Sequence, residues 1–315
     1  MKKLKPVAIL LAAILLLSLA SCASGGNAPA ASASPAASTE PAASAEPSAS
    51  AEPAASEKPA ASEEPAASEE PAAEPVELIV FAAASMTETL TQIIEDYKTV
   101  APNVTIVPTF DSSGTLKTQI QEGAECDLFI SAAQKQMNQL DSSKDAEANP
   151  DGLDFVLQGT RVNLLENKVV LAVPDANPKD IQSFEDLATD KLSLLCIGNE
   201  DVPVGAYSEE ILTYLGILEG LESSGKLTYG SNVKEVTTQV KEGTVDAGII
   251  YATDAFSANL NVVAEATKDM CRQVIYPAAV LNITKNEQAA KDFLAYLQSD
   301  AAMTVFKSVG FAPAA

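Results

Sequence analysis

The sequence predicts an α/β protein with two lobes, and three observations support this class. Short apolar runs with the character of strands alternate with segments whose apolar residues recur at helical spacing, which indicates sheets flanked by helices. This alternation pauses after residue 140 and begins again near residue 168. The chain of 315 residues is also long enough for about two domains. We therefore expect two α/β lobes, each built around a mostly parallel sheet.

The first lobe begins with three strand–helix pairs. Residues 104–110 form a β-branched run typical of a strand, whereas residues 86–98 place Leu90, Ile93 and Ile94 on one helical face. Strands that alternate with helices in this way favour a parallel sheet. The expected strands are residues 76–81, 104–110 and 127–131, and the expected helices are residues 86–98, 116–121 and 133–140.

The second lobe repeats the alternation, and the end of the chain returns to the first lobe. We expect residues 76–158 with 274–315 to form the first lobe and residues 159–273 to form the second. Two crossings between the lobes would make a hinge, and ligands favour the cleft at the carboxyl ends of strands. The remaining strands are expected at residues 168–173, 192–197, 247–251, 262–264 and 274–281, and the helices at residues 184–188, 206–215, 233–241, 287–298 and 301–309.

The amino terminus has the pattern of an export signal. Three lysines precede an apolar run at residues 7–20, which is typical of a secretory signal. The run closes on Leu-Ala-Ser-Cys, which resembles the lipobox of bacterial lipoproteins. The resemblance implies a signal peptide at residues 1–22 and lipidation of Cys22. An uncleaved signal anchor, or an ordinary signal with an incidental cysteine, is the alternative.

Residues 23–75 have a biased composition of Ala, Ser, Pro and Glu, with near-repeats and no large apolar residue. A segment of this composition cannot bury a core and is expected to be disordered. We interpret it as a tether between a lipid on Cys22 and the folded part. The protein is then expected to be extracytoplasmic, anchored to the outer face of the cell membrane.

Composition excludes several classes of function. The net charge is −23 and the only arginines are Arg161 and Arg272, which argues against a nucleic-acid partner. The chain has no histidine, so Ser-His-Asp catalysis and imidazole zinc sites are excluded. Catalysis by carboxylates or lysine stays open. An anionic ligand would have to be held by local dipoles, because the overall field repels it.

Three cysteines follow the lipobox, namely Cys126, Cys196 and Cys271, and an odd number leaves at least one free thiol. Cys126 and Cys196 stand in runs that resemble strand interiors. We interpret them as buried free thiols rather than as a disulfide or a metal site.

Serines stand at two junctions between a strand and a helix in the first lobe. Ser85 follows Phe-Ala-Ala-Ala, and Glu88 three residues later completes a capping-box pattern. The arrangement recurs in Asp111-Ser112-Ser113-Gly114, where either serine can cap and Gly114 permits a close backbone approach. Helix caps alone would explain both serines. Alternatively, their hydroxyls and the free N–H groups at the helix starts bind an anion.

The second lobe has three further candidate positions. Val204 precedes a predicted helix and can offer only its backbone N–H. Asn232 with Glu235 has the pattern of an N-cap, which leaves the N–H of Val233 unpaired in the first turn. Tyr251 ends an apolar strand, where it is either a ligand-binding hydroxyl or an ordinary half-buried core residue.

Five segments of the folded part carry a resemblance to a known family; they are, in order, VFAAASMTETL, TFDSSGTLKTQIQEGAECDLFISAAQKQM, DVPVGAYSEEIL, NVKEVTTQVKEGTVDAGIIYATDA and VIYPAAVLN. Together they resemble the periplasmic molybdate-binding proteins of bacterial ABC transporters. The resemblance implies a type II periplasmic-binding-protein fold that captures molybdate, with tungstate, for an ABC permease. It also implies that the oxoanion is held through five positions without direct metal ligation: Ser85, Ser113, Val204, Val233 and Tyr251.

This resemblance agrees with the chemistry of the candidate residues. A deprotonated tetrahedral oxoanion only accepts hydrogen bonds, and these positions only need to donate them. Two departures are mild: residue 204 is valine where relatives also have alanine, and the turn is Ser-Ser-Gly where some members carry a third serine. We expect no enzyme activity, no cofactor and a monomer. The alternatives are a site for sulfate, phosphate or a small organic anion, a hydrolase using Asp111 or Asp254, and a structural surface protein.

Overall fold

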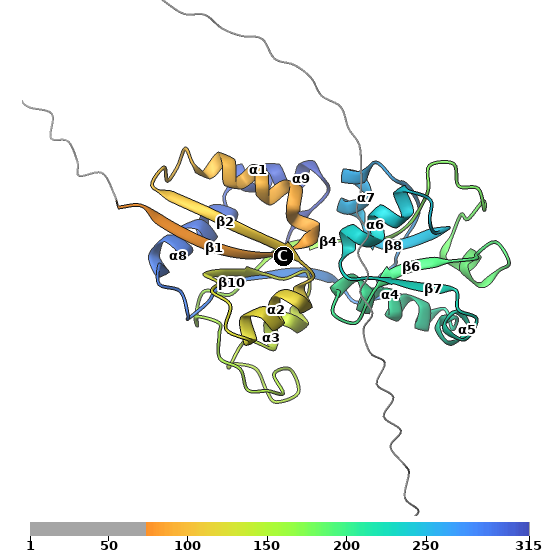
Figure 1. The fold of residues 1–315 in the computed structure, drawn as a ribbon, viewed down its shortest axis with the longest axis horizontal. Coiled ribbons are helices and arrows are strands. Elements are labelled where there is room, and N and C mark those ends of the chain that lie inside the picture. The colour runs from red at the N-terminus through yellow and green to blue at the C-terminus, as the bar shows by residue number, and fades with distance from the viewer. Residues whose placement is uncertain (1–73, 315) are drawn as a thin grey trace, which may run out of the picture. The chain divides into compact units, whose positions relative to one another are not determined.

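The computed structural model describes residues 74–314, which form two β-sheets with helices packed against each (Figure 1). The predicted signal peptide, the lipidation of Cys22 and nearly all of the predicted tether lie outside the described residues. Among residues 74–314, the helices are all too short or too polar to span a membrane.

The first sheet has six strands in the order β11-β4-β10-β3-β1-β2. β1 is parallel to β2 and β3, and its apolar run places Leu78, Val80 and Ala82 in the core with almost no exposure. β10 returns late in the chain and runs antiparallel between β3 and β4. The strands are β1 (Val76–Ala83), β2 (Val104–Asp111), β3 (Leu128–Ile130), β4 (Val162–Asn167), β10 (Val274–Val280) and β11 (Ala312–Pro313).

The helices of the first lobe include two from the end of the chain. The predicted helical face of α1 is confirmed, since Leu90, Ile93, Ile94 and Tyr97 are all buried. In Figure 1 the blue helices α8 and α9 lie beside the orange β1 and α1, and α9 contacts α1 while α8 contacts β1. The helices are η1 (Ala84–Met86), α1 (Thr87–Tyr97), α2 (Ser113–Gln121), α3 (Gln134–Asn138), α8 (Glu287–Leu297) and α9 (Asp300–Ser308).

The second sheet has five strands in the order β7-β6-β8-β5-β9. The helix α6 turns Val236 and Val240 inward, and it packs on β8 and β6. The strands are β5 (Val169–Val173), β6 (Leu195–Gly198), β7 (Leu227–Gly230), β8 (Ala247–Tyr251) and β9 (Asn261–Glu265), and the helices are η2 (Phe184–Ala188), α4 (Pro203–Tyr214), α5 (Leu218–Ser223), α6 (Val233–Lys241) and α7 (Ala252–Ala258).

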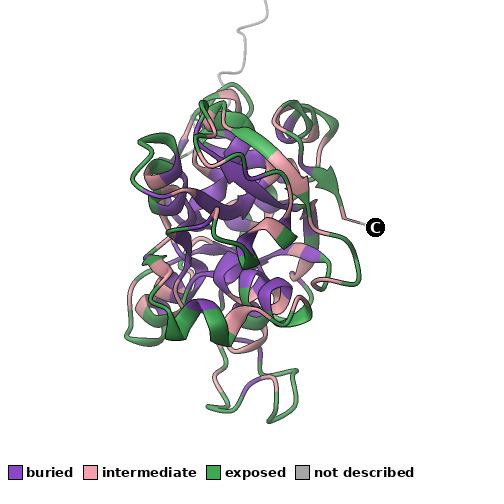
Figure 2. Ribbon diagram, turned by 90° about the vertical axis from the view of Figure 1, so that its right-hand side faces the viewer, coloured by how far each residue is buried: buried purple, intermediate pink, exposed green. Residues whose placement is uncertain are grey.

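Both sheets are buried in the middle of their lobes, and exposed residues concentrate on the outer helix faces and loops (Figure 2). Cys126 and Cys196 are buried free thiols as predicted, and Cys271 is partly exposed. A row of aromatic rings in edge-to-face contact runs from the second lobe to the first. The ring centres of Tyr207 and Tyr251 are 6.4 Å apart, and those of Tyr251 and Tyr276 are 5.8 Å apart. The two cores are therefore in contact.

The sheets are mixed, but most strands of each run in one direction, as predicted: β1–β4 in the first sheet and β6–β9 in the second. Only the β1–β2 and β1–β3 pairings are parallel in the first sheet, and only β6–β7 and β6–β8 in the second. Each antiparallel pairing includes β4, β5 or β10, the strands next to the two crossings between the lobes. The reversed strands are β10 and β11 in the first sheet and β5 in the second.

One boundary also differs from the prediction. β4 lies in the first sheet, although residues 159–273 were expected to belong to the second lobe. Only Lys168 separates β4 from β5, so the chain passes from one sheet to the other at that residue. It returns between β9 and β10. The strand β7 and the helices α5 and α7 were not predicted, because their short segments lack a clear period.

Candidate functional site

A small cavity lies between elements of the two lobes. The first lobe contributes residues at the carboxyl ends of β1, β2 and β3, and the second contributes the starts of α4 and α6 and the end of β8. This is where the cleft was expected. The lining residues are Ala83, Ala84, Ser85, Asp111, Ser112, Ser113, Ala132, Val202, Pro203, Val233 and Tyr251.

Four of the five predicted site residues line this cavity: Ser85, Ser113, Val233 and Tyr251. Val204 does not line it, although the two preceding residues, Val202 and Pro203, do. The structure thus brings together residues that are far apart in the sequence and come from both lobes.

The two serines at the start of α2 have different roles. Ser112 caps the helix, since its hydroxyl oxygen accepts the Thr115 N–H at 3.1 Å. Ser113 is then free of capping, and its oxygen accepts the Ala132 N–H at 2.9 Å. A hydroxyl that already accepts a bond from a backbone N–H keeps its own proton for another partner. Ser113 is fully buried and lines the cavity, so a ligand there can accept this proton.

Ser85 does not cap a helix, and the predicted capping box is wrong. A single 3₁₀ turn, η1, precedes α1, so that α1 begins one residue later than the box requires and Met86 takes the N-cap position. Glu88 instead pairs with Lys234 of the second lobe at 2.7 Å. The hydroxyl of Ser85 lies 2.8 Å from the hydroxyl of Tyr276. Ser85 is therefore held by a residue that the sequence pattern did not indicate.

The starts of α4 and α6 face the cavity from the second lobe. Asn232 caps α6 as predicted, with its side-chain oxygen accepting the Glu235 N–H at 3.1 Å. Val233 is the first residue of α6, and Val204 is the second residue of α4, after Pro203. N–H groups at these positions have no acceptor within their own helix. The two helix starts thus supply unpaired donors and a partial positive charge.

The hydroxyl of Tyr251 has an unusual environment. It is completely buried and makes no hydrogen bond with any residue of the described part of the chain. Burial, and secondly the nearby Tyr276 hydroxyl, hold the pKa of Tyr251 well above its ordinary value, so the phenol stays protonated. A buried hydroxyl without a partner is unfavourable. This hydroxyl therefore needs a hydrogen-bond acceptor that a ligand in the cavity can provide.

Charged groups near the cavity are engaged elsewhere. The carboxylate of Asp111 accepts the Ser112 N–H at 2.7 Å and the side-chain amide of Asn232 at 3.3 Å. No lysine or arginine is among the residues that line the cavity. The nearby Lys234 lies 3.0 Å from the buried Asp254 and pairs with Glu88. The cavity consequently offers neutral donors rather than cations.

Several contacts join the lobes around the cavity. The N–H of Gly114 donates to the carbonyl of Asp201 at 3.0 Å, and a Cβ on Gly114 would lie only 2.3 Å from that oxygen. Glycine is thus required here for close approach, as the sequence indicated. The Asn232–Asp111 and Lys234–Glu88 contacts also cross from one lobe to the other. These contacts hold the lobes closed over the cavity.

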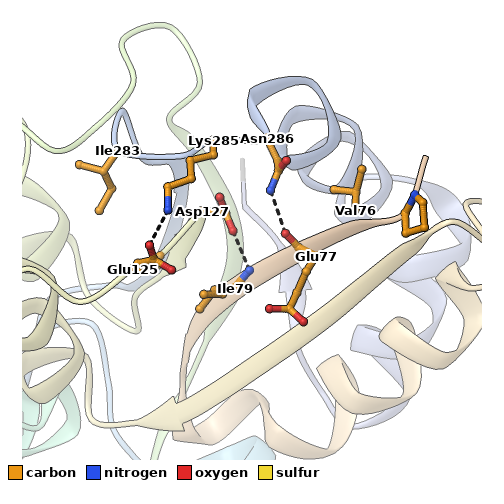
Figure 3. A pocket seen from close by; sticks show the side chains of 10 residues that line it. Val76, Glu77, Ile79, Glu125, Asp127, Ile283, Lys285 and Asn286 are labelled. Carbon is orange, nitrogen blue, oxygen red and sulfur yellow. Dashed lines mark hydrogen bonds and ion pairs between the residues drawn. The ribbon is translucent and has the colours of Figure 1, made fainter. Parts of the chain in front are cut away.

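A second hollow lies near the start of the described chain, beside β1 (Figure 3). Its polar groups bind one another: Lys285 pairs with Glu125 at 2.6 Å, and Asp127 accepts the Ile79 N–H at 2.7 Å. The side-chain amide of Asn286 donates to the carbonyl of Glu77. Because these groups already have partners, the hollow lacks the unpaired donors of the first cavity.

Two α/β lobes joined by two crossings, with a cavity of donors between them, define a binding protein that closes on a small solute. The chain belongs to the family of bacterial extracellular solute-binding proteins, whose sequence profile matches residues 78–312. The described fold is the two-lobed type II periplasmic-binding-protein fold that the resemblance implied, with mixed sheets.

Three similar proteins are informative. YvgL of Bacillus subtilis, provisionally named an ABC transporter substrate-binding lipoprotein, is 37% identical over 239 residues, which cover 75% of this chain and 86% of YvgL. The molybdate-binding protein ModA of Haemophilus influenzae is 35% identical over 240 residues, covering 75% and 89%. The periplasmic molybdate-binding protein structure of Azotobacter vinelandii superposes with a TM-score of 0.65 at 22% identity, covering 75% and 98%, and shows the shared fold.

Sequence reasoning missed the groups behind the cavity wall. Tyr276 contacts Ser85, and Asn167 contacts Tyr276, but neither residue stands in a motif with a recognisable spacing. Tyr276 lies inside the segment VIYPAAVLN, which carried the resemblance without a role for the tyrosine. Only the pairing of β10 with β4 indicates that the two side chains meet.

Proposed function

We propose that this protein captures molybdate, and tungstate with it, outside the cytoplasm and delivers the oxoanion to an ABC permease. The observation that carries this proposal is the cavity itself. It is lined by hydroxyl and backbone donors, includes a buried Tyr251 hydroxyl without a partner, and contains no cationic side chain. The molybdate-binding names of relatives such as the ModA of Haemophilus influenzae support the identity of the ligand.

The donor set suits a fully deprotonated tetrahedral oxoanion. Such an ion has four oxygens that accept hydrogen bonds and none that donates. Bonds from neutral donors to an anion are strengthened by its charge, and they strengthen further where water is excluded. The starts of α4 and α6 add partial positive charge without a lysine or an arginine. The site can therefore hold a dianion although the whole chain carries a net charge of −23.

The five proposed binding positions remain Ser85, Ser113, Val204, Val233 and Tyr251. Hydroxyls would donate from the two serines and the tyrosine, and backbone N–H groups from the two valines. Val204 enters through its N–H in the first turn of α4, next to the lining residue Pro203. The metal is bound only through the oxygens of its oxoanion, and the protein acts as a carrier rather than an enzyme.

The location and anchoring follow from the family and the amino-terminal pattern. We expect a lipid on Cys22 to attach the protein to the outer face of the membrane, with residues 23–75 as a tether between this lipid and the folded part. The lipoprotein name of YvgL supports this expectation. The protein would act as a monomer that docks on the permease in its closed form.

Calorimetric titration of the purified protein with molybdate, tungstate, sulfate and phosphate in one buffer tests the ligand. We expect tight one-to-one binding of molybdate and tungstate, with sulfate and phosphate at least about 100-fold weaker, a difference of about 2.7 kcal/mol. Preferred binding of sulfate or phosphate would move the protein to another class of oxoanion carrier. Binding of none of the four would overturn the proposal.

A further inference from the structure

Asn167 stands at the crossing between the lobes, as the last residue of β4. Its side-chain oxygen accepts the N–H of Lys168 at 2.8 Å. A backbone N–H can only donate, so this bond fixes which end of the amide is oxygen and which is nitrogen. The amide nitrogen therefore faces Tyr276 and Thr253, and it donates to their hydroxyl oxygens at 3.2 and 2.9 Å.

The orientation of Asn167 determines the direction of the next bond. The Tyr276 hydroxyl is fully buried and accepts a hydrogen from Asn167. It has a single proton. Among the described residues, the Ser85 hydroxyl lies within hydrogen-bonding distance at 2.8 Å, whereas the nearby Tyr251 hydroxyl makes no hydrogen bond. Tyr276 consequently donates to Ser85, and Ser85 accepts.

Ser85 then keeps its own proton for the cavity that it lines. Ser113 is in the same condition, because its oxygen accepts the Ala132 N–H. The hydroxyl oxygens of both serines thus already accept a hydrogen bond from a group behind the cavity wall. A ligand in the cavity meets hydroxyl protons rather than lone pairs at these two positions.

We propose that Asn167 and Tyr276 are positioning residues that turn the hydroxyl proton of Ser85 toward the bound oxoanion. The proposal rests on the proposed function, since it names how one binding position of that site is oriented. It makes the site selective for ligands whose oxygens only accept hydrogen bonds. We call the hydrogen-bonded series from Asn167 through Tyr276 to Ser85 the relay. Thr253 of α7 accepts a bond from the same amide of Asn167, so the relay lies where the two lobes meet.

The decisive test reverses the relay with Asn167→Asp. A carboxylate at this position has no proton to give, so Tyr276 would donate to residue 167 and would accept from Ser85 instead. The Ser85 proton would then be turned away from the cavity. We expect calorimetric titration to give molybdate binding about 10- to 100-fold weaker than that of the unaltered protein.

Tyr276→Phe distinguishes this mechanism from repulsion by the new charge. Alone, it should weaken molybdate binding by about threefold or less, because the Ser85 proton remains free to reach the cavity. Combined with Asn167→Asp, it should restore affinity to the level of Tyr276→Phe alone. A merely structural role for the two residues, or repulsion by the carboxylate, would not produce rescue by a second substitution.

Asn163→Asp is the matched control, because it introduces the same charge on the same strand at an exposed site. Its side-chain oxygen already accepts a bond from Gln134, which aspartate preserves. This variant should bind molybdate like the unaltered protein. If Asn167→Asp does not fold, as judged by thermal melting, Asn167→Ala replaces it. Loss of the amide donor should weaken binding by about threefold to tenfold, and Tyr276→Phe should remove that loss.

The outcomes separate the two proposals. If the unaltered protein binds none of the oxoanions, the proposed function and the relay both fail. If it binds molybdate but Asn167→Asp binds equally well, only the relay fails. The relay also fails if the double variant stays as weak as Asn167→Asp. Rescue in the double variant supports it.

Discussion

The two lobes supply the cavity with different kinds of donor. The first lobe offers the hydroxyls of Ser85 and Ser113, which can rotate and can either donate or accept. The second lobe offers backbone N–H groups at the starts of α4 and α6, which can only donate and are held by the helix itself. Tyr251, also from the second lobe, adds one hydroxyl.

This difference explains why the serine hydroxyls have hydrogen-bond partners behind the cavity wall and the helix starts do not need them. Each serine of the first lobe has a partner that occupies its acceptor side, the Ala132 N–H for Ser113 and the Tyr276 hydroxyl for Ser85. The helix starts need no such partner, because the direction of an N–H follows from the backbone. A side-chain donor is therefore sensitive to its neighbours, whereas a backbone donor is sensitive only to changes in the backbone.

The largest effect is expected where the two lobes touch. Gly114→Ala would place a Cβ about 2.3 Å from the carbonyl oxygen of Asp201, too close for the lobes to close fully. We expect molybdate affinity to fall by about 100-fold or more, and ligand-induced compaction in small-angle scattering to be reduced, because the closed state is disfavoured. Gly220→Ala on α5 meets nothing within 4 Å and is the control. Unchanged binding by Gly114→Ala would contradict the closed arrangement.

The next largest effect concerns a side-chain donor. Ser113→Ala removes the hydroxyl that faces the cavity and leaves the Ala132 N–H without its acceptor. We expect molybdate binding about 10- to 100-fold weaker, and a free energy of unfolding lower by about 1–3 kcal/mol in urea denaturation. Ser308→Ala on the exposed side of α9 should change neither quantity. Parent-like affinity in Ser113→Ala would remove this serine from the site.

Backbone donors should respond to proline but not to alanine. Val233→Pro removes one N–H at the first position of α6, where helices accept proline, and the extended conformation of Asn232 (φ −155°, ψ 170°) suits a following proline. Molybdate affinity should fall about tenfold. Val233→Ala keeps the N–H and should stay within about threefold. Equal affinity of the two variants would show that this N–H does not bind the ligand.

The smallest expected effect is a pH dependence of stability from the second lobe. Burial raises the pKa of Asp254 to about 6, opposed by the neighbouring Lys234. The folded state therefore holds this proton more tightly than the unfolded chain, so its contribution to stability increases as pH falls from 7 toward 4. Relative to Asp254→Asn, the free energy of unfolding should rise by about 1–2 kcal/mol over this range in urea titrations. A parallel pH dependence in both proteins would contradict the raised pKa.

The sequence predicted most elements and the local structure at several helix starts. The helices α1 and α6 and the strands β1, β2 and β8 lie within a few residues of their predicted ranges, because each has a clear apolar period. The Asn232 cap was also predictable, since a cap involves residues only three positions apart. The capping box at Ser85 failed because an inserted 3₁₀ turn is not visible in a four-residue pattern.

Periodicity, helix caps and composition can be read from short segments, so the sequence alone determined what depends on them. It determined the α/β class, the two runs of alternating strands and helices, the donors at helix starts and the absence of histidine. The tertiary structure decided the placement of β4 in the first sheet, the mixed strand directions and the closure of Gly114 on Asp201. It also decided the contact of Ser85 with Tyr276, which is 191 positions away in the chain. Such contacts depend on how distant segments pack, and no local pattern encodes which hydroxyl a serine will meet.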